Sequence, residues 1–244
     1  MTSDTLRASW DEVAYGYLEY WAPRFRPWME VAVAALPGRL TGPIVVPCCG
    51  PGLELDLLAQ RFDRSRLEGV DFSQSMVDLC RARGYAARLG DAAALDGPAS
   101  ILSTFGLQQL PEPDAALRRW VEGVPPGGAL SVMLWPYDTS DAGPFDVLRR
   151  WAEDALGATA PAWEATLLDG LPSGLRLMDR PVPLSIRHDS GVAFWDAMLA
   201  SGPGRAMAQR VPRPLLDEVS AELARRWPGP FDHQPTARHV VILN

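Results

Sequence analysis

The chain has 244 residues, of which 47% are hydrophobic and 22% are charged, and its formal net charge is -7. This length and apolar content favour one large or two small globular domains with a full core. The acidic balance disfavours a nucleic-acid substrate, and because all 23 basic residues are arginines, a P-loop and Schiff-base lysine chemistry are excluded.

Targeting and metal signals are absent from the sequence. No run approaches the roughly 18 apolar residues of a membrane span, and the start, Met1 to Asp4, has no basic region leading into an apolar segment. We therefore expect a cytoplasmic protein without a membrane partner. The spacing of Cys48, Cys49 and Cys80 matches neither a disulfide framework nor a metal site, so we expect buried thiols and no metal.

The first 36 residues have a helical pattern. Ser9 and Glu12 fit a capping box, and apolar residues then recur at helical spacing up to Trp21. Pro23 and Pro27 interrupt this pattern, which predicts a second helix after them. Such an aromatic stripe more often serves core packing than binding.

Strand and helix patterns alternate from residue 42 to residue 135. Helices are predicted to begin near Leu53, Gln74 and Pro113, with Ser73 as an N-cap and Gly84 just after the C-terminus of the second helix. This alternation predicts an α/β fold with a doubly wound, mostly parallel sheet. The predicted strands are Pro43–Val46, Leu67–Val70, Ala86–Leu89, Ser100–Thr104 and Ala129–Leu134.

The pattern after Trp135 is less regular. A turn-rich loop leads to a helix that ends near Leu156, and further helices are predicted over Val192–Leu199 and Pro214–Trp227. Extended segments at Leu175–Ile186 and His239–Leu243 are expected to complete the same sheet.

A glycine loop and two acids follow successive predicted strands. Gly50 and Gly52 lie between the first strand and its helix, whereas Asp71 and Asp91 end or follow the next two strands. Ligands bind at the carboxyl ends of parallel strands, so these residues indicate a nucleoside site. Leu55 occupies the third glycine position of the dinucleotide fingerprint, which argues against hydride transfer. Neither a nucleophile elbow nor a zinc hydrolase motif is present.

Five motifs in order resemble those of class I S-adenosylmethionine-dependent methyltransferases of the small-molecule type. They are the glycine loop, Gly69–Met76, Gly90–Ala92, Ser103–Pro111 and Pro125–Gly128. The resemblance covers about residues 8 to 135. It implies a single seven-stranded Rossmann-like domain over 1–244, with a helical cap at 1–40, a cofactor-binding core at 41–135, and a substrate lid and final strands at 136–244.

The resemblance also assigns the cofactor-binding residues. Asp71 is expected to accept from the ribose hydroxyls and Asp91 from the adenine amino group, while Met76 and Phe105 are expected to line the ring. S-adenosylmethionine is the implied cofactor and S-adenosylhomocysteine the product. The expected cofactor-binding set is Cys48, Gly50, Gly52, Asp71, Phe72, Met76, Asp91, Ala92 and Phe105.

The chain departs from the family pattern at two places. Val46 stands where the family has an acid that helps hold the ammonium group of the cofactor, and Cys48 replaces the first glycine. Gln108 and Gln109 stand where related enzymes often have histidines, and a neutral amide positions a substrate but is no general base near neutral pH.

The resemblance implies methyl transfer to a small, largely apolar acceptor, for which we predict a role in secondary metabolism. The expected catalytic residues are Tyr137, His188 and Gln109, and the expected substrate-binding residues are Tyr15, Tyr20, Trp21, Gln108 and Trp135. Two alternatives stay open: a cyclase or pericyclic catalyst that retains the cofactor without using its methyl group, and a non-catalytic binding protein. We expect a monomer or homodimer that binds no nucleic acid.

Overall fold

A computed structural model describes residues 3–244, which divide into two compact units. The sheet unit comprises Arg26–Trp135, Ala162–Val182 and Ala237–Asn244. The helical unit comprises residues 3–25, Pro136–Pro161 and Pro183–Thr236. Each unit therefore assembles segments that lie far apart in the sequence.

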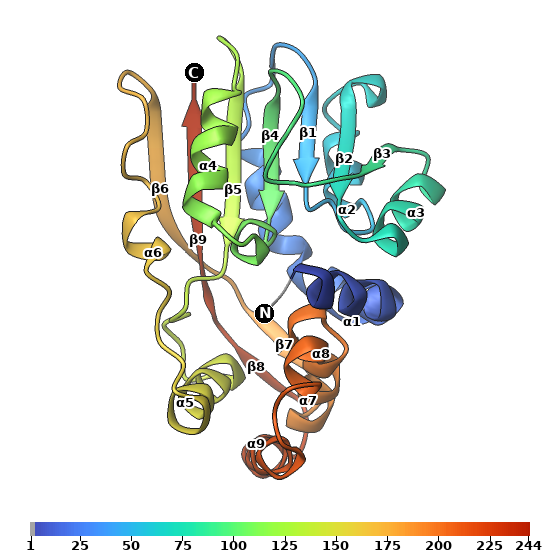
Figure 1. The fold of residues 1–244 in the computed structure, drawn as a ribbon, viewed down its shortest axis with the longest axis vertical. Coiled ribbons are helices and arrows are strands. Elements are labelled where there is room, and N and C mark those ends of the chain that lie inside the picture. Colours follow the sequence, from blue (N-terminus) through green and yellow to red (C-terminus); the bar gives the residue numbers. More distant parts are fainter. Residues whose placement is uncertain (1–2) are drawn as a thin grey trace. The chain divides into compact units, whose positions relative to one another are not determined.

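The sheet unit is built on a seven-stranded sheet with strand order β3-β2-β1-β4-β5-β9-β6 (Figure 1). Strands β1 to β5 pair in parallel, whereas β9 is antiparallel to β5. The mostly parallel α/β fold predicted from the sequence is confirmed, including its two late strands. The strands are β1 (Ile44–Pro47), β2 (Leu67–Asp71), β3 (Ala86–Leu89), β4 (Ser100–Thr104), β5 (Ala129–Leu134), β6 (Arg176–Pro183) and β9 (Thr236–Leu243).

Burial explains why the central strands have no alternating pattern. Every residue of β1, β4 and β5 is buried, as expected for strands covered on both faces. The edge strands β3 and β6 are more exposed. The helical elements of the sheet unit, besides the end of α1, are α2 (Leu53–Leu58), η1 (Arg64–Arg66), α3 (Gln74–Ala82), η2 (Leu107–Gln109), α4 (Pro113–Glu122) and α6 (Trp163–Thr166).

Two predicted helix-end signals are confirmed in α3. The hydroxyl of Ser73 accepts a hydrogen bond from the Met76 amide at 3.2 Å, which satisfies one of the free amides of the first turn. Gly84 adopts φ +84 after the last turn, a conformation that glycine reaches without steric cost.

The core beside α4 is centred on Trp120, whose exposed fraction is 1%. Its indole N–H donates to the Ala92 carbonyl at 2.9 Å, so the ring is buried without an unsatisfied donor. Apolar residues of β4, β5 and β9 complete this cluster. Helix α4 is thereby fixed against the sheet, and the segment that follows β3 is fixed against α4.

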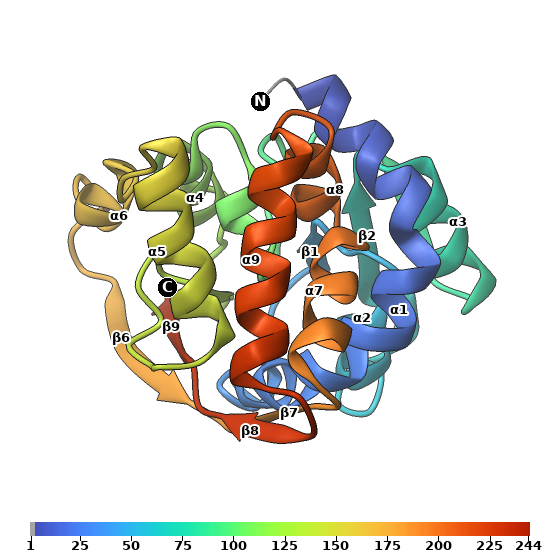
Figure 2. The ribbon, with the colours of Figure 1, turned by 90° about the horizontal axis from the view of Figure 1, so that it is seen from below.

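In the described part of the chain, the helical unit contains the start of α1, four further helices and a two-stranded ribbon. Helix α7 packs against α8 and α9, and α5 also packs against α9 (Figure 2). Within residues 3–244, no helix has the length and apolarity needed to cross a bilayer. The elements are α5 (Pro144–Leu156), β7 (Ile186–His188), α7 (Gly191–Leu199), α8 (Gly202–Ala208), α9 (Arg213–Arg226) and β8 (Phe231–His233).

The N-terminal segment corrects one prediction. Instead of two helices interrupted by Pro23 and Pro27, the chain forms one helix, α1 (Ser3–Ala34). A proline inside a helix removes a hydrogen bond and costs about 3 kcal/mol. Burial of large aromatic side chains along the helix offsets this cost, since each such side chain contributes about 1.5–3 kcal/mol. The buried aromatic residues on either side of the prolines are Trp21, Phe25 and Trp28.

The predicted capping box is also wrong, because Ser9 lies inside α1. Its hydroxyl donates to the Thr5 carbonyl at 2.9 Å rather than accepting from a free amide. Glu12 pairs with Arg205 of α8 instead of returning to the backbone. The capping pattern therefore reflects a contact between helices of the helical unit.

Candidate functional site

The candidate site lies where the strand order reverses in the sheet unit. Strands β1 and β4 are neighbours in the sheet. The chain continues from β1 to β2 on one side and from β4 to β5 on the other, so the loops that follow β1 and β4 diverge. Ligands of doubly wound folds bind at such a position. The glycine loop after β1 and the segment 105–109 after β4 both begin here.

The glycine loop keeps the backbone conformation of a glycine-rich turn although Cys48 replaces a glycine. Cys48 has φ +55, Gly50 +50 and Gly52 +88. A Cβ at Gly50 would meet nothing within 4 Å, whereas one at Gly52 would lie 2.9 Å from the sulfur of Cys80. Space is thus open above Gly50 and filled at Gly52, so the first glycine leaves room for a ligand and the second permits packing.

Asp71 is fixed at the end of β2 by backbone amides. Gly50 donates to its Oδ2 and Ser73 to its Oδ1, each at 2.9 Å, and only 4% of the residue is exposed. A carboxylate has about four acceptor positions, so it accepts additional donors while held in this orientation. The structure therefore joins the predicted acid to the predicted glycine loop.

The remaining residues of the predicted cofactor set lie after β2, in α3 and after β3. Asp91 is exposed, and its Oδ1 accepts from the Ala93 amide at 2.8 Å. Ala92 is 4% exposed and Met76 is 3% exposed, whereas Phe72 is half-buried. The Gly90 amide donates to the Asp71 carbonyl at 2.9 Å, which ties this segment to the end of β2.

A further carboxylate, Glu54, belongs to the site but was not predicted from the sequence. It lies on α2 with 4% exposure and accepts a hydrogen bond from the hydroxyl of Thr104 at the end of β4. Its position four residues before buried Leu58 places it on the inner face of α2, which is the signal that the sequence offered. The contact joins the segments that follow β1 and β4.

The electrostatics of the site are acidic. Burial raises the pKa of Glu54 to about 7, with a further contribution from Asp71 and an opposing one from the Thr104 hydrogen bond. Burial also raises the pKa of the Cys48 thiol well above its ordinary value, and Asp71, Asp91 and Glu54 add to the effect. Because three carboxylates act on one point, the site favours a cation over an anion.

An aromatic wall continues from the end of β4. Phe105 adopts φ +58, and its ring stacks on Trp135 with centroids 4.6 Å apart, while Trp28 meets both rings edge-on. The half-buried Gln108 has its side-chain Oε1 buried without a hydrogen-bond partner among the described residues. Gln109 closes η2 through its backbone amide, which donates to Gly106.

The other predicted residues lie in the helical unit. The hydroxyl of Tyr20 is 2.8 Å from Nδ1 of His188, and the ring of Trp21 lies edge-on to the His188 ring at 6.0 Å. Tyr15 is 71% exposed on another face of α1. Burial and the neighbouring Glu153 raise the pKa of Tyr137, which makes its hydroxyl a weaker proton donor.

The site fits a cationic nucleoside. It combines open space over Gly50, a fixed carboxylate at Asp71 and a buried carboxylate at Glu54. Across residues 3–244, no group of three His, Cys, Asp or Glu side chains is arranged to hold a metal.

Comparisons with known proteins identify the family. A model of the methyltransferase domain matches residues 44–128. Trans-aconitate 2-methyltransferase of Rhizobium meliloti (strain 1021) is 30% identical over 186 residues, which cover 74% of this chain and 70% of that protein. The chain belongs to the class I S-adenosylmethionine-dependent methyltransferases. This chain is also 28% identical to the trans-aconitate 2-methyltransferase of Sinorhizobium fredii, over 87% of this chain and 84% of that protein.

Solved structures show the same fold. Phosphoethanolamine N-methyltransferase 2 of Haemonchus contortus, in complex with S-adenosylhomocysteine, gives a TM-score of 0.58 at 12% identity and covers 100% of this chain and 60% of that chain. The plantazolicin methyltransferase BamL gives 0.51 at 12% identity, with coverage of 99% and 96%. S-adenosylmethionine is the methyl donor of this methyltransferase, as the sequence predicted.

Proposed function

We propose that this methyltransferase acts on a small, largely apolar molecule of secondary metabolism. The supporting observation is the stacked pair of Phe105 and Trp135. Phe105 follows directly after Thr104, whose hydroxyl donates a hydrogen bond to Glu54. Aromatic side chains next to a few fixed polar groups are typical of sites for small molecules. An apolar acceptor would pack against the rings of Phe105 and Trp135. A hydroxyl of the acceptor would donate a hydrogen bond to the buried Oε1 of Gln108.

The residues expected from the sequence to bind the cofactor are part of this proposal. Asp71, held by the amides of Gly50 and Ser73, accepts from the ribose hydroxyls, and the open space over Gly50 admits the ligand. Asp91 and Ala92 face the adenine edge, with Met76 and Phe72 beside the ring. A bound S-adenosylmethionine supplies an electrophilic methyl group on a positively charged sulfur.

Glu54 compensates for the family acid that Val46 replaces. Its carboxylate is buried and bonded to Thr104; it adds to the raised pKa of the Cys48 thiol, and Asp71 adds to the raised pKa of Glu54 itself. A cation next to this carboxylate favours its ionised form. Glu54 therefore receives the cationic end of the cofactor from α2, where other members of the family use the end of β1.

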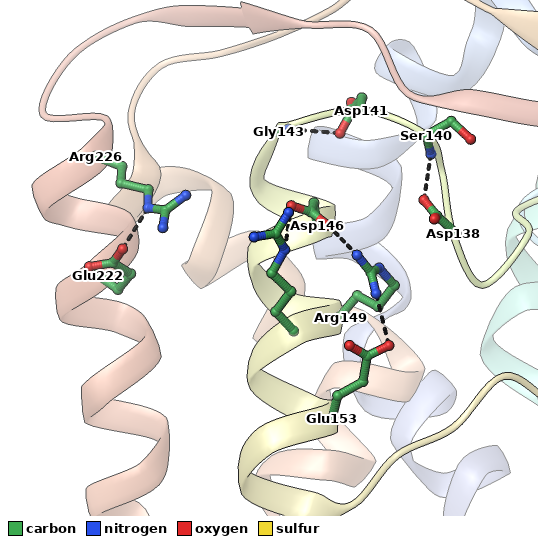
Figure 3. Close-up of polar contacts among 10 residues, drawn as sticks. Asp138, Ser140, Asp141, Gly143, Asp146, Arg149, Glu153, Glu222 and Arg226 are labelled. Atoms are coloured by element: carbon green, nitrogen blue, oxygen red, sulfur yellow. Dashed lines mark hydrogen bonds and ion pairs between the residues drawn. The ribbon is translucent and has the colours of Figure 1, made fainter.

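The acceptor differs from the one that the relatives' names state. Trans-aconitate carries several carboxylates, which require cationic partners. In the helical unit, Arg24 pairs with Asp189, Arg205 pairs with Glu12, and Arg149 pairs with acids of α5 (Figure 3). Each of these three arginines already has an acid of the chain as its partner, and the aromatic wall of the sheet unit supports an uncharged acceptor.

Two measurements test the proposal. Asp71→Ala is expected to weaken S-adenosylmethionine binding by about 1–3 kcal/mol in isothermal titration, because charge-assisted hydrogen bonds are lost. Asp78→Ala, which removes an exposed acid of α3, serves as the control. In a transfer assay, S-adenosylhomocysteine should form with hydroxylated aromatic acceptors and not with trans-aconitate. Formation with trans-aconitate alone, or unchanged affinity of Asp71→Ala, refutes the corresponding assignment.

A further inference from the structure

The two carboxylates beside the glycine loop have different hydrogen-bond donors. Oδ2 of Asp71 accepts from the Gly50 amide and Oδ1 from the Ser73 amide, each at 2.9 Å. Among residues 3–244, the donors to Glu54 are its own backbone amide and the Thr104 hydroxyl. Amides held by the backbone on both oxygens stabilise a negative charge. Asp71 is therefore supported as an anion more strongly than Glu54.

Glu54 lies where an unbalanced charge is unfavourable. It is 4% exposed on α2, where it contacts the end of β4. Within the described chain, no arginine forms an ion pair with it. Asp56, two residues later on the same helix, is instead paired with Arg83 and accepts from the Tyr85 hydroxyl. A buried carboxylate without a cationic partner is more stable when it carries a proton.

The titratable groups that face Glu54 add to this preference. Burial raises the pKa of Glu54 to about 7, the Thr104 hydroxyl opposes the increase, and Asp71 of β2 adds to it. Cys48 and Cys49, in the loop after β1, bring no cation. The pKa of each thiol is raised well above its ordinary value, chiefly by burial for Cys48 and by a hydrogen bond with another thiol for Cys49. Glu54 is thus surrounded by acids and neutral thiols.

We propose that Glu54 holds a proton in the free protein and releases it when the cofactor binds, so that the site exchanges one proton for the cationic end of the cofactor. This inference rests on the proposed function, in which Glu54 receives that end. It adds that pH near neutrality regulates cofactor affinity. An acid at the end of β1 with amide donors like those of Asp71 would be charged in both states and would release nothing.

The charge balance of the exchange closes. The O–H bond of the Glu54 carboxylic acid breaks, its electrons stay on the oxygen, and the proton passes to water and then to the buffer. Gly50 is partly exposed, and a Cβ there would meet nothing within 4 Å, so water reaches the loop. The Thr104 hydroxyl accepts from the protonated acid and donates to the carboxylate, because a hydroxyl does both. The contact between α2 and β4 therefore persists in both states.

Titration calorimetry with S-adenosylmethionine and no acceptor tests the exchange. With a pKa of about 7 in the free protein, about 0.9 proton should leave Glu54 for each cofactor bound at pH 6. Repeating the titration in buffers with different enthalpies of ionisation measures this number. The dissociation constant should fall by more than about tenfold between pH 5.5 and pH 7.5, because binding no longer has to displace the proton.

Two matched variants separate the Glu54 proton from all others. Glu54→Gln keeps the shape of the side chain and cannot ionise, so its binding should release about 0.9 proton fewer at pH 6. The wild type should bind more tightly than this variant at pH 7.5, and its advantage should shrink by more than about tenfold by pH 5.5. Glu30→Gln, which alters an exposed acid, should match the wild type throughout.

The Thr104 hydroxyl provides a second test that keeps the acid. Because its hydrogen bond lowers the pKa of Glu54, Thr104→Val should raise the pH at which the affinity levels off. Thr104→Ser retains a hydroxyl and should restore the wild-type profile. Infrared difference spectra at pH 6 should also show the carbonyl band of a protonated acid disappear when S-adenosylmethionine is added, and Glu54→Gln should lack this change.

The outcomes separate the exchange from the proposed function. Equal proton release by Glu54→Gln and the wild type, or a wild-type advantage that does not change with pH, overturns the exchange and leaves cofactor binding intact. An unshifted profile in Thr104→Val overturns the assignment of the proton to Glu54. Equal affinities of Glu54→Gln and the wild type at pH 7.5 refute the proposed contact of Glu54 with the cofactor itself. A failed transfer assay contradicts only the proposed acceptor, since these titrations contain none.

Discussion

Glu54→Gln offers a direct test of the buried carboxylate in the candidate site. Glutamine has nearly the same shape as glutamate, and its carbonyl oxygen still accepts the hydrogen bond from Thr104. The substitution therefore removes a buried charge with little change in packing. Because burial is the main cause of the raised pKa, the effect on stability should depend on pH.

The magnitude follows from the shifted pKa. Between pH 4.5, the ordinary value for glutamate, and about pH 7, the folded protein binds a proton on Glu54 that the unfolded chain has released. The free energy of unfolding of the wild-type protein therefore falls as pH rises through this window. Since one pKa unit corresponds to about 1.4 kcal/mol, the ionised Glu54 costs about 3 kcal/mol at pH 8. Glu54→Gln lacks this cost.

Urea unfolding without the cofactor measures the difference. The variant should be more stable than the wild type by about 3 kcal/mol at pH 8 and nearly equal to it at pH 4.5. Glu30→Gln, which alters an exposed acid paired with Arg26, should show no such trend. Other titrating groups cancel in the comparison because both proteins contain them. A stability difference that does not change with pH contradicts the reasoning.

Further predictions concern the glycine loop and two histidines. Gly52→Ala should lower the free energy of unfolding by more than about 2 kcal/mol, since the left-handed backbone costs about 1–2 kcal/mol and the new Cβ meets Cys80 at 2.9 Å. Gly50→Ala should cost only about 1 kcal/mol and weaken S-adenosylmethionine binding more in titration calorimetry; equal stability losses contradict this contrast. Burial lowers the pKa of His188 to about 3 and of His239 to about 4. The unfolded chain thus binds more protons below pH 6.5, and urea unfolding should show stability falling by about 3 kcal/mol for each histidine as pH drops to 4, a slope that His239→Gln should reduce.

The parallel core could be predicted because its signals are local. Buried strands such as Ile44–Pro47 form short apolar runs, and the side chain of Ser73 marks a helix start by a contact three residues away. Gly50 and Gly52 likewise indicated the tight turn before α2 from the local sequence alone. These features depend on neighbours in the sequence, so no tertiary information was needed.

The continuous α1 was not predictable from local rules. Pro23 and Pro27 oppose a helix locally, and only the burial of flanking aromatic side chains in the fold outweighs them. Helix α8 and strand β8 were likewise missed, because both are short and lie among glycine and proline residues. Tertiary contacts decide the structure of such segments.

The candidate site was predicted only where it follows a motif. Glu54 was missed because its role depends on Thr104, 50 residues away on β4. The pairing of Tyr20 with His188 spans 168 residues. Residues that act through contacts between distant segments require the structure.

The three thiols described above have a practical consequence for spectroscopy. Cys49 and Cys80 are buried, and the pKa of both Cys48 and Cys49 is raised well above the ordinary value, chiefly by burial for the first and by the contact with Cys80 for the second. Maleimide dyes react with thiolates, so these positions label slowly at neutral pH. A cysteine introduced on the surface would then be almost the only residue that the dye labels. Fluorescence from that position could be followed in solution without first removing the native thiols.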